Sequence, residues 1–388
     1  MVLKVAGRSE ISPFIVMDIM RMANRLSMKG SDIIHLEVGQ PSTKAPRAVL
    51  ETAKTALDQN LLGYTDALGF ADLRKRLTAY YQDYYNCAIS SDRIIITTGS
   101  SGAFLLSFLS VFEAGDKVGL VVPTYPAYKN ILKAIGVEIL EIHVSHETGF
   151  QPNREILESL DTKLDGLIIA SPSNPTGSMI KKIIFEEILD WCAQKKVRVI
   201  SDEIYHGITY NEKAETALSY NDDAIIINSF SKYFCMTGWR LGWMVVPDNL
   251  IRTIERLAQN LFISPPTISQ LSAVSAFECL EELDSNVLRY ADNRNILQEE
   301  LPKIGLKRFA PSDGAFYLYV DVSDYTNDSF SLCQDLLTDA GLAITPGTDF
   351  DSRNGNYFIR LSFASSTFNI SSAIKRLDQF LSKKKSSH

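Results

Sequence analysis

Short runs made mostly of apolar residues recur along the middle of the chain, separated by longer stretches with helical spacing. The runs occupy residues 94–97, 118–122, 166–170, 197–201 and 225–227. Runs of this length without polar alternation are typical of strands that are buried on both faces of a sheet. The helical stretches suit the crossovers that join parallel strands. The pattern therefore predicts an α/β fold with a mostly parallel sheet between layers of helices.

The two ends of the chain follow different patterns. Near the start, a helix is predicted to begin at Pro13, and residues 33–38 are predicted to form a short strand that ends at a Gly-Gln-Pro turn. After about residue 285, a long polar helix is followed by strands at 314–320 and 357–363 and by a closing helix. This second pattern predicts a smaller α+β domain beside the sheet.

Polar and glycine-rich segments directly follow the predicted strands. In chain order these segments are Gly99-Ser100-Ser101-Gly102, Tyr125, Asn174, Asp202 to Tyr205, and Ser229 to Lys232. In an open sheet of parallel strands, ligands bind beyond the carboxyl ends of the strands. We therefore expect these side chains to form one ligand site.

Composition narrows the classes of partner. The 388 residues carry a formal net charge of −7, which gives no basic footprint for nucleic acid. Five cysteines are dispersed without the spacing of a zinc site or of a disulfide framework, as is typical of a reducing compartment. The sequence shows no secretory signal and no apolar run near the ~20 residues of a spanning helix. We therefore expect a cytoplasmic protein that binds neither nucleic acid, membrane nor metal.

One loop combines a single lysine with small hydroxyl residues and an arginine. It runs from Ser229 to Trp243 and contains Lys232, Thr237 and Arg240. Nearby positive charge and partial burial favour the neutral, nucleophilic form of a lysine amine, which Schiff-base chemistry requires. A surface turn is the alternative interpretation of a Ser-x-Ser-Lys fragment alone, but the whole string is much rarer by chance.

Three further positions can each be interpreted in two ways. The Gly-Ser-Ser-Gly turn at 99–102 could bind a phosphate through backbone N–H groups and serine hydroxyls, or could only begin a helix. Asp202 ends a buried strand, where a carboxylate needs a partner, or it caps a helix. Arg360 could bind a carboxylate through two parallel hydrogen bonds or form a structural ion pair.

Taken together in chain order, these motifs resemble those of the class I/II aminotransferases, which use pyridoxal phosphate and have fold type I. The matching motifs run from Gly39 to Arg360, nearly the whole chain. The resemblance implies a seven-stranded type of sheet in a large cofactor-binding domain of residues 45–285, with a small domain formed by residues 1–44 and 286–388. It also implies transfer of an amino group between an L-amino acid and a 2-oxo acid, by a homodimer with shared active sites.

The resemblance also assigns roles to individual residues. Lys232 is implied to form the Schiff base and to move the substrate proton, with Asp202 and Tyr205 as the other catalytic residues. Substrate is implied to bind at Gly39, Asn174 and Arg360. The residues implied to hold pyridoxal 5′-phosphate are Gly99, Ser100, Ser101, Tyr125, Asn174, Asp202, Tyr205, Ser229, Lys232 and Arg240, with Tyr64 reaching the cofactor of the partner subunit.

One departure from the family pattern bears on the substrate. Some aspartate-using relatives carry a lysine in the phosphate turn, whereas the turn in this sequence contains no basic side chain. We therefore expect donors with neutral or aromatic side chains, selected by walls that include Phe14, Ile15 and the ring of Tyr125. A distal basic residue from a loop, Arg353 or Lys44, is the alternative that would restore a preference for aspartate.

Two other functions fit parts of the sequence. A β-lyase would use the same lysine and cofactor, and would release pyruvate and ammonia without a 2-oxo acid acceptor. A ligand-sensing regulator built on an aminotransferase body would need a DNA-binding segment, and the residues before Gly39 are too few and too apolar for one.

Overall fold

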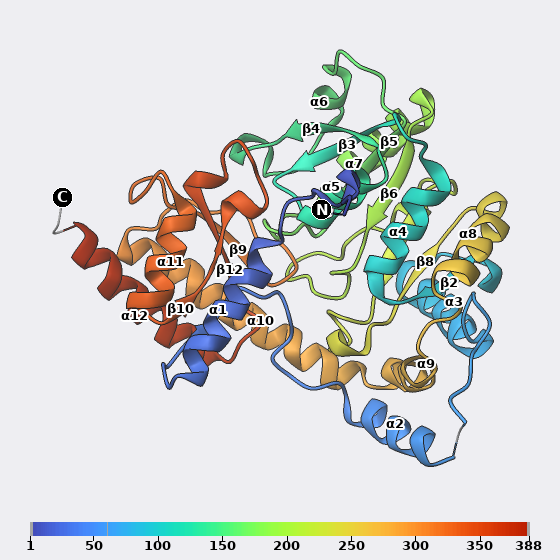
Figure 1. Cartoon of the computed structure of the whole chain (residues 1–388), viewed down its shortest axis with the longest axis horizontal. Coiled ribbons are helices and arrows are strands. Elements are labelled where there is room, and N and C mark those ends of the chain that lie inside the picture. The colour runs from blue at the N-terminus through green and yellow to red at the C-terminus, as the bar shows by residue number, and fades with distance from the viewer. Residues whose placement is uncertain (1–2, 60, 386–388) are drawn as a thin grey trace.

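The computed structural model describes residues 3–59 and 61–385 (Figure 1). Within these residues, seven strands form a central sheet in the order β2-β8-β7-β6-β5-β3-β4. The strands are β2 (Ile94–Thr97), β3 (Lys117–Val122), β4 (Glu138–His143), β5 (Gly166–Ala170), β6 (Arg198–Asp202), β7 (Ile225–Ser229) and β8 (Gly242–Val245). Strands β3 to β7 pair in parallel, and β8 lies antiparallel between β2 and β7. The predicted α/β class and the mostly parallel sheet are confirmed.

Two strands of this sheet were not predicted from the apolar runs. Strand β4 lies at the edge of the sheet, pairs only with β3 and carries partly exposed side chains such as Glu141. An edge strand is covered less completely, so it needs no unbroken apolar run. Strand β8 begins at Gly242, inside the motif that contains Lys232. A Cβ at Gly242 would lie 2.9 Å from the backbone nitrogen of Ser100, so glycine lets β8 approach the turn after β2.

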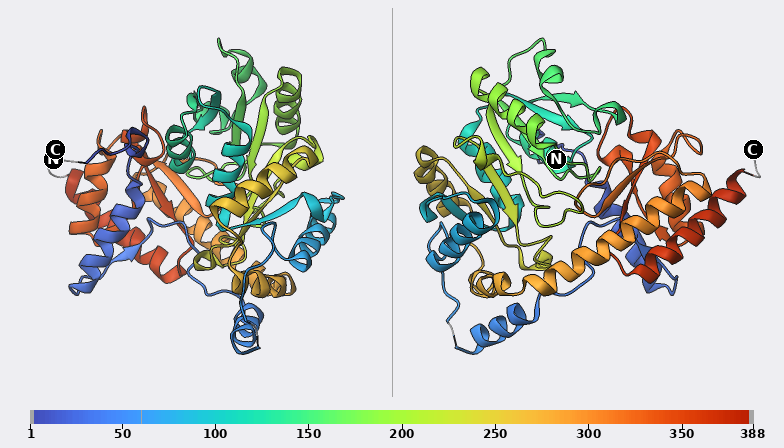
Figure 2. Two further views of the ribbon diagram at one scale, coloured as in Figure 1. Left: turned by 45° about the vertical axis from the view of Figure 1, so that its right-hand side comes forward. Right: turned by 180° about the vertical axis from the view of Figure 1, so that it is seen from behind.

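Helices cover both faces of the central sheet (Figure 2). Consecutive residues of β7 show the alternation: Ile225 and Ile227 pack in one buried cluster, and Ile226 packs in another on the opposite face. Because both faces are covered, an apolar residue is favoured at every position of these strands. The helices of this part of the chain are α2 (Arg47–Gln59), α3 (Ala71–Tyr85), α4 (Gly99–Val111), α5 (Pro126–Ala134), α6 (Arg154–Glu158), α7 (Lys182–Lys195), α8 (Asp248–Leu261) and α9 (Thr267–Val274).

The two ends of the chain pack together. In Figure 1, α1 at the blue end of the chain lies beside the orange and red elements of the other end. A two-stranded parallel pair joins β1 to β10, and a second sheet has the antiparallel order β11-β12-β9. The elements are α1 (Ile15–Met28), β1 (Ile34–His35), α10 (Leu280–Glu300), β9 (Tyr317–Asp321), α11 (Ser329–Asp339), β10 (Leu342–Ala343), β11 (Thr345–Pro346), β12 (Phe358–Ser362) and α12 (Thr367–Lys385).

The terminal elements differ from the predicted ones in length. The strand predicted at 33–38 is limited to Ile34 and His35, which pair with Leu342 and Ala343 of β10. The domain boundaries at residues 45 and 285 stay a prediction. Among the described helices, none combines the length and apolar character needed to cross a membrane. The described His, Cys, Asp and Glu side chains form no group of three or more that could hold a metal ion.

Candidate active site

Lys232 lies in the loop that follows β7, at the carboxyl edge of the central sheet. Its Nζ donates a hydrogen bond to the carbonyl oxygen of Gly39 at 2.6 Å and lies 5.7 Å from the centre of the Tyr205 ring. Burial, together with the positive charge of Arg360, lowers the pKa of this amine to about 8, against the opposing effect of Asp202. A larger fraction of the amine is therefore neutral and nucleophilic near neutral pH than for an exposed lysine.

Gly39 allows this contact by leaving room for a neighbouring side chain. A Cβ at this position would lie 1.5 Å from the hydroxyl oxygen of Tyr317. Tyr317 in turn shares a hydrogen bond with the hydroxyl of Tyr205 at 2.7 Å. The turn predicted at Gly39 thus places its carbonyl oxygen on Lys232 while two tyrosine hydroxyls pack beside it.

Asp202 ends β6 and is 3% exposed, so its carboxylate needs partners within the protein. One oxygen, Oδ1, accepts the backbone N–H of Ile204 at 3.1 Å, and Oδ2 accepts the hydroxyl of Tyr128. Burial raises the pKa of Asp202 to about 6, whereas the hydrogen bond from Tyr128 opposes that shift. The residues after Asp202 form a turn and no helix, so the alternative of a helix cap is reduced to one local hydrogen bond.

Arg360 on β12 is buried, and it takes part in none of the ion pairs between described residues. Its guanidinium lies between the rings of Tyr317 and Phe350, with centroid distances of 4.3 and 4.7 Å. Nη1 donates to Oδ1 of Asn174 at 2.8 Å, and Nη2 donates to the carbonyl oxygen of Glu37. Nε is buried without a hydrogen-bond partner. A fixed guanidinium with an unpaired donor suits an incoming carboxylate better than a structural ion pair.

The anion-binding side of the site lies where α4 begins. Ser100 and Ser101 occupy the first turn of this helix, whose N–H groups and dipole favour negative charge. Arg240 faces this turn in the left-handed backbone conformation, with φ of 52°, and Nη1 donates to the carbonyl oxygen of Thr237 at 3.0 Å. A Cβ at Gly99 would lie 2.6 Å from Nη2 of Arg240, so only glycine leaves the guanidinium in this position. A phosphate group fits this combination of donors.

A single cavity collects most of the predicted residues. Its lining is Phe14, Val16, Met17, Val38, Gly39, Ser100, Ser101, Tyr125, Asn174, Asp202, Ile204, Tyr205, Ser231, Lys232, Thr237, Arg240, Tyr317 and Arg360. Three predicted residues lie outside this list. Gly99 lies against the guanidinium of Arg240. The Ser229 hydroxyl donates a hydrogen bond to Oγ of Ser231 in its own loop at 2.9 Å. Tyr64 is 84% exposed on the surface of its own chain.

Two of the three residues that were predicted as donor-selecting walls line this cavity. The rings of Phe14 and Tyr125 meet edge to face at 5.6 Å and both line the cavity. Ile15 is wrong as a wall, because it lines a neighbouring hollow instead. Its place is taken by Val16 and Met17, which the sequence analysis did not single out. Neither Arg353 nor Lys44 lines the cavity, and both are exposed.

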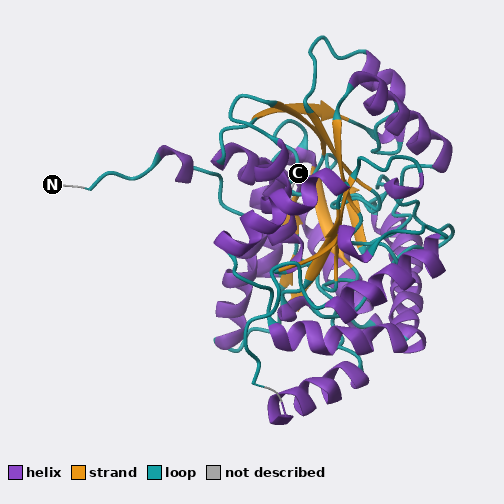
Figure 3. Ribbon diagram, turned by 90° about the vertical axis from the view of Figure 1, so that its right-hand side faces the viewer, coloured by secondary structure: helices purple, strands orange, loops and turns teal. Residues whose placement is uncertain are grey.

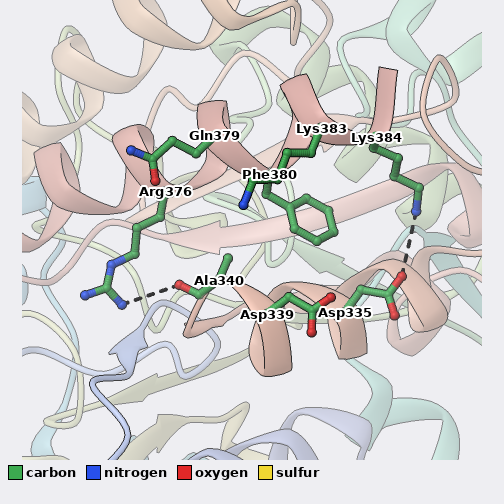
Figure 4. A pocket seen from close by; sticks show the side chains of 8 residues that line it. All are labelled: Asp335, Asp339, Ala340, Arg376, Gln379, Phe380, Lys383 and Lys384. Atoms are coloured by element: carbon green, nitrogen blue, oxygen red, sulfur yellow. Dashed lines mark hydrogen bonds and ion pairs between the residues drawn. The ribbon is translucent and has the colours of Figure 1, made fainter. Parts of the chain in front are cut away.

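A larger hollow lies elsewhere and lacks this chemistry. It has a volume of about 830 Å³ and lies between α11 and α12, whereas the cavity at Lys232 has about 150 Å³ (Figure 4). Charged side chains in this hollow are engaged with the protein: Lys384 pairs with Asp335 at 3.8 Å, and Arg376 donates to the carbonyl oxygen of Ala340 at 3.4 Å. The smaller cavity is the candidate active site because a partly buried lysine, a buried carboxylate and a buried guanidinium converge there.

Comparison with known proteins gives a consistent result. A family model described as aminotransferase class I and II matches residues 31–377. The chain is 46% identical to valine–pyruvate aminotransferase of Mycobacterium tuberculosis, covering 97% of this chain and 98% of the relative. It is 35% identical to (5-formylfuran-3-yl)methyl phosphate transaminase of Methanocaldococcus jannaschii, covering 95% and 97%.

Solved structures agree with the sequence relatives. The crystal structure of an aminotransferase from Mycobacterium tuberculosis matches with a TM-score of 0.96 at 45% identity, covering 98% of this chain and 100% of the other. Aspartate aminotransferase from Thermus thermophilus with maleate matches with a TM-score of 0.92 at 28% identity, covering 97% and 100%. In both comparisons the likeness covers nearly the whole chain.

Proposed function

Since the chain belongs to the class I and II aminotransferase family and is an aminotransferase, we propose that it binds pyridoxal 5′-phosphate and uses Lys232 as its catalytic lysine. The observation that carries the proposal is the convergence of Lys232, Asp202 and Arg360 on one cavity. Bound pyridoxal phosphate supplies an aldehyde that bonds reversibly to amines and a ring that withdraws electrons from the substrate.

The residues present fit each part of this cofactor. Arg240, Ser100 and Ser101 would hold the phosphate together with the N-terminus of α4 and with Ser229, and Gly99 keeps that cradle open. The rest of the cofactor would contact Asp202, Asn174, Tyr205 and Tyr125, which line the same cavity. Asp202 would hold the protonated ring nitrogen, since a buried carboxylate favours a cationic partner. Nδ2 of Asn174 and the Tyr205 hydroxyl would donate to the phenolic oxygen.

Arg360 and Lys232 have different proposed roles toward the substrate, one in binding and the other in proton transfer. Arg360 would bind the α-carboxylate with its guanidinium and so fix the orientation of the Cα–H bond. Asn174 supports that orientation because it already accepts a hydrogen bond from Nη1 of Arg360. The Lys232 amine would take the proton from Cα and return it at the other end of the reaction, as a general base and acid. Its lowered pKa of about 8 keeps both forms accessible near neutral pH.

We propose a donor with a neutral, apolar side chain and a 2-oxo acid acceptor. Support comes from the apolar wall of Phe14, Val16 and Met17, and from the absence of any basic residue other than Lys232, Arg240 and Arg360 among the described residues that line the cavity. The relative at 46% identity is named for valine and pyruvate, whereas relatives named for aspartate are about 31% identical. An apolar pocket discriminates by about 1–3 kcal/mol per methylene, so several apolar donors should react.

The test is a set of half-reactions of the cofactor-loaded protein with single amino acids. Absorbance of the bound cofactor should change with valine, leucine and alanine, and the amino group should later be recovered on added pyruvate. Release of ammonia and pyruvate from a cysteine conjugate without an acceptor would instead indicate a β-lyase. Failure of every amino acid to change the absorbance would overturn the proposed function.

We also propose a homodimer in which Tyr64 completes the partner's phosphate site. Its high exposure in one chain and the neighbouring exposed Leu57 and Leu61 support a covered surface in the assembly. Two-fold dimers are the commonest assembly of soluble oligomers. A cytoplasmic location is supported by the cysteines, all five of which are free in the structure.

A further inference from the structure

The N-terminal end of helix α1 is held by a residue from the far end of the chain. The backbone N–H of Ile15 donates to Oδ1 of Asp349 at 3.1 Å, and that of Val16 donates to Oδ2 at 3.2 Å. Phe14, at the position where a helix is usually capped, supplies no side-chain hydrogen bond. The carboxylate of Asp349 therefore satisfies two of the N–H groups that a helix start leaves free, and its charge suits the helix dipole.

Packing also holds this end of the helix, because Val16 is 4% exposed and Ile15 packs against the apolar cluster of Ile19, Ala23, Leu337 and Ala343. Residues 3–13 are all exposed, and Figure 3 shows this segment leading away from the body of the molecule. Just before the helix, Asn130 donates a hydrogen bond to the carbonyl oxygen of Ser12 at 3.3 Å, and the Phe14 ring meets that of Tyr125 edge to face. Asp349 itself is 9% exposed, so its carboxylate is shielded from water, which strengthens these hydrogen bonds.

The held turn forms one wall of the substrate cavity. Phe14, Val16 and Met17 line the cavity from this turn, and Lys232 lines the same cavity. The residue after Asp349 is Phe350, whose ring lies 4.7 Å from the guanidinium of Arg360. The same short segment therefore touches both the apolar wall and the arginine proposed to bind the α-carboxylate.

We propose that Asp349 is a positioning residue for donor specificity, which holds the first turn of α1 so that its apolar side chains select the donor side chain. This inference rests on the proposed function. The proposal predicts a difference between donors that a merely structural helix cap would not produce. Loss of Asp349 should impair donors in proportion to the apolar surface that they place against Phe14, Val16 and Met17, and should spare a donor with a minimal side chain.

The experiment compares Asp349→Ala and Asp349→Asn with Asp18→Asn, in the cofactor-loaded protein. Asp18 is the matched control, because it lies in the same first turn but pairs with Arg21 on the exposed side. Single-turnover half-reactions with alanine, valine and leucine give an apparent dissociation constant and a limiting rate for each donor. We expect Asp349→Ala to raise the constant about tenfold for leucine and valine and less than about threefold for alanine, a tenfold change being ~1.4 kcal/mol. Limiting rates should change less than about twofold, and the control should match the wild type.

The amide variant keeps the proposal testable if Asp349→Ala does not fold. An asparagine retains one acceptor oxygen, so Asp349→Asn should show the same donor order with a smaller effect, and amide exchange should accelerate at Ile15 and Val16 but not across the central sheet. An equal loss for all three donors, or no loss for any, would overturn the positioning role. A wild-type protein that converts no donor would instead refute the proposed function, so the two failures are distinguishable.

Discussion

Tyr128 donates its hydroxyl hydrogen to Oδ2 of Asp202, so that both oxygens of this buried carboxylate accept hydrogen bonds from the protein. Tyr128 lies on α5, and its ring packs 5.3 Å from that of Tyr125 in the cavity wall. A hydrogen bond to a carboxylate favours the charged form, against the burial that raises its pKa to about 6. The pair therefore keeps Asp202 ionised where a cationic ring nitrogen is proposed to bind.

Tyr128→Phe should move the acid limb of the pH profile of kcat/KM upward. Removal of the donor raises the pKa of Asp202, so the carboxylate is protonated at a higher pH and activity is lost earlier as pH falls. A hydrogen bond to a charged group is worth about 1.5–3 kcal/mol, so a shift of roughly one pH unit or more is expected. Tyr220→Phe is the control, because it removes a hydrogen bond to Glu215 of 2.6 Å away from the cavity. Superimposable profiles for Tyr128→Phe and wild type would contradict the role.

Asp202→Asn should weaken cofactor binding and lower kcat by several orders of magnitude. The amide leaves the ring nitrogen without its anionic partner, and loss of one electrostatic group alone costs about 10²–10³ in kcat. Cofactor affinity by fluorescence titration and kcat by steady-state assay are the measurements. Asp165→Asn serves as control, since that carboxylate accepts the N–H of Lys117 at the opposite edge of the sheet. Near-normal turnover would leave Asp202 with only its local hydrogen bond to Ile204.

The chemistry-bearing edge of the fold could be predicted from the sequence, but its supporting contacts could not. Strands β2, β3, β5, β6 and β7 were found because both of their faces are buried, which produces unbroken apolar runs. The polar residues after them were found because each directly follows such a run. Tyr128 and Asp349 were missed because their partners lie 74 and more than 330 residues away, and no local pattern encodes such contacts.

Tyr64 does not line the cavity of its own chain, for a different reason. Sequence resemblance assigns it to the site of a partner subunit, and one chain alone leaves its side chain 84% exposed. Ile15 shows a limit of another kind. Adjacent positions on a helix point about 100° apart, and the helix begins at Ile15 and not at the predicted Pro13, so the pattern alone did not show whether Ile15 or Val16 faces the cavity.

Lys232→Ala should bind pyridoxal phosphate without a covalent link. Reduction with borohydride should fix the cofactor to the wild type and to the control Lys54→Ala, which changes an exposed lysine paired with Glu51. Because burial lowers the pKa of Lys232 to about 8, the rate of cofactor attachment should rise about tenfold per pH unit below that value and then level off. Labelling of any other lysine by mass spectrometry would refute the assignment, and a rate that keeps rising well above pH 9 would refute the lowered pKa.

Tyr64 should act on the site of the partner subunit. Sedimentation should show a dimer at working concentration. Tyr64→Ala should weaken cofactor binding, although Lys232 is unchanged in this variant. Mixing Tyr64→Ala subunits with Lys232→Ala subunits should restore activity, since a hybrid dimer has one site with both side chains intact. Random exchange makes about half of the dimers hybrid, so about a quarter of wild-type activity is expected for a two-fold assembly. Mixtures no more active than their parents, or a fully active monomer, would contradict the shared site.

Arg360→Lys should impair all amino donors together. A lysine keeps the positive charge, but it loses the planar pair of donors and the stacking between Tyr317 and Phe350. We expect the same fold loss in kcat/KM for alanine, valine and leucine, in contrast to the graded loss expected for Asp349→Ala. Arg308→Lys is the control, because its guanidinium pairs with Asp321 at the exposed edge of β9. The same assay should rank aspartate below these donors, since the described lining offers a distal carboxylate no separate cation. A kcat/KM for aspartate about tenfold above the others, about 1.4 kcal/mol in the transition state, would refute the proposed donor class and leave the transfer of an amino group intact.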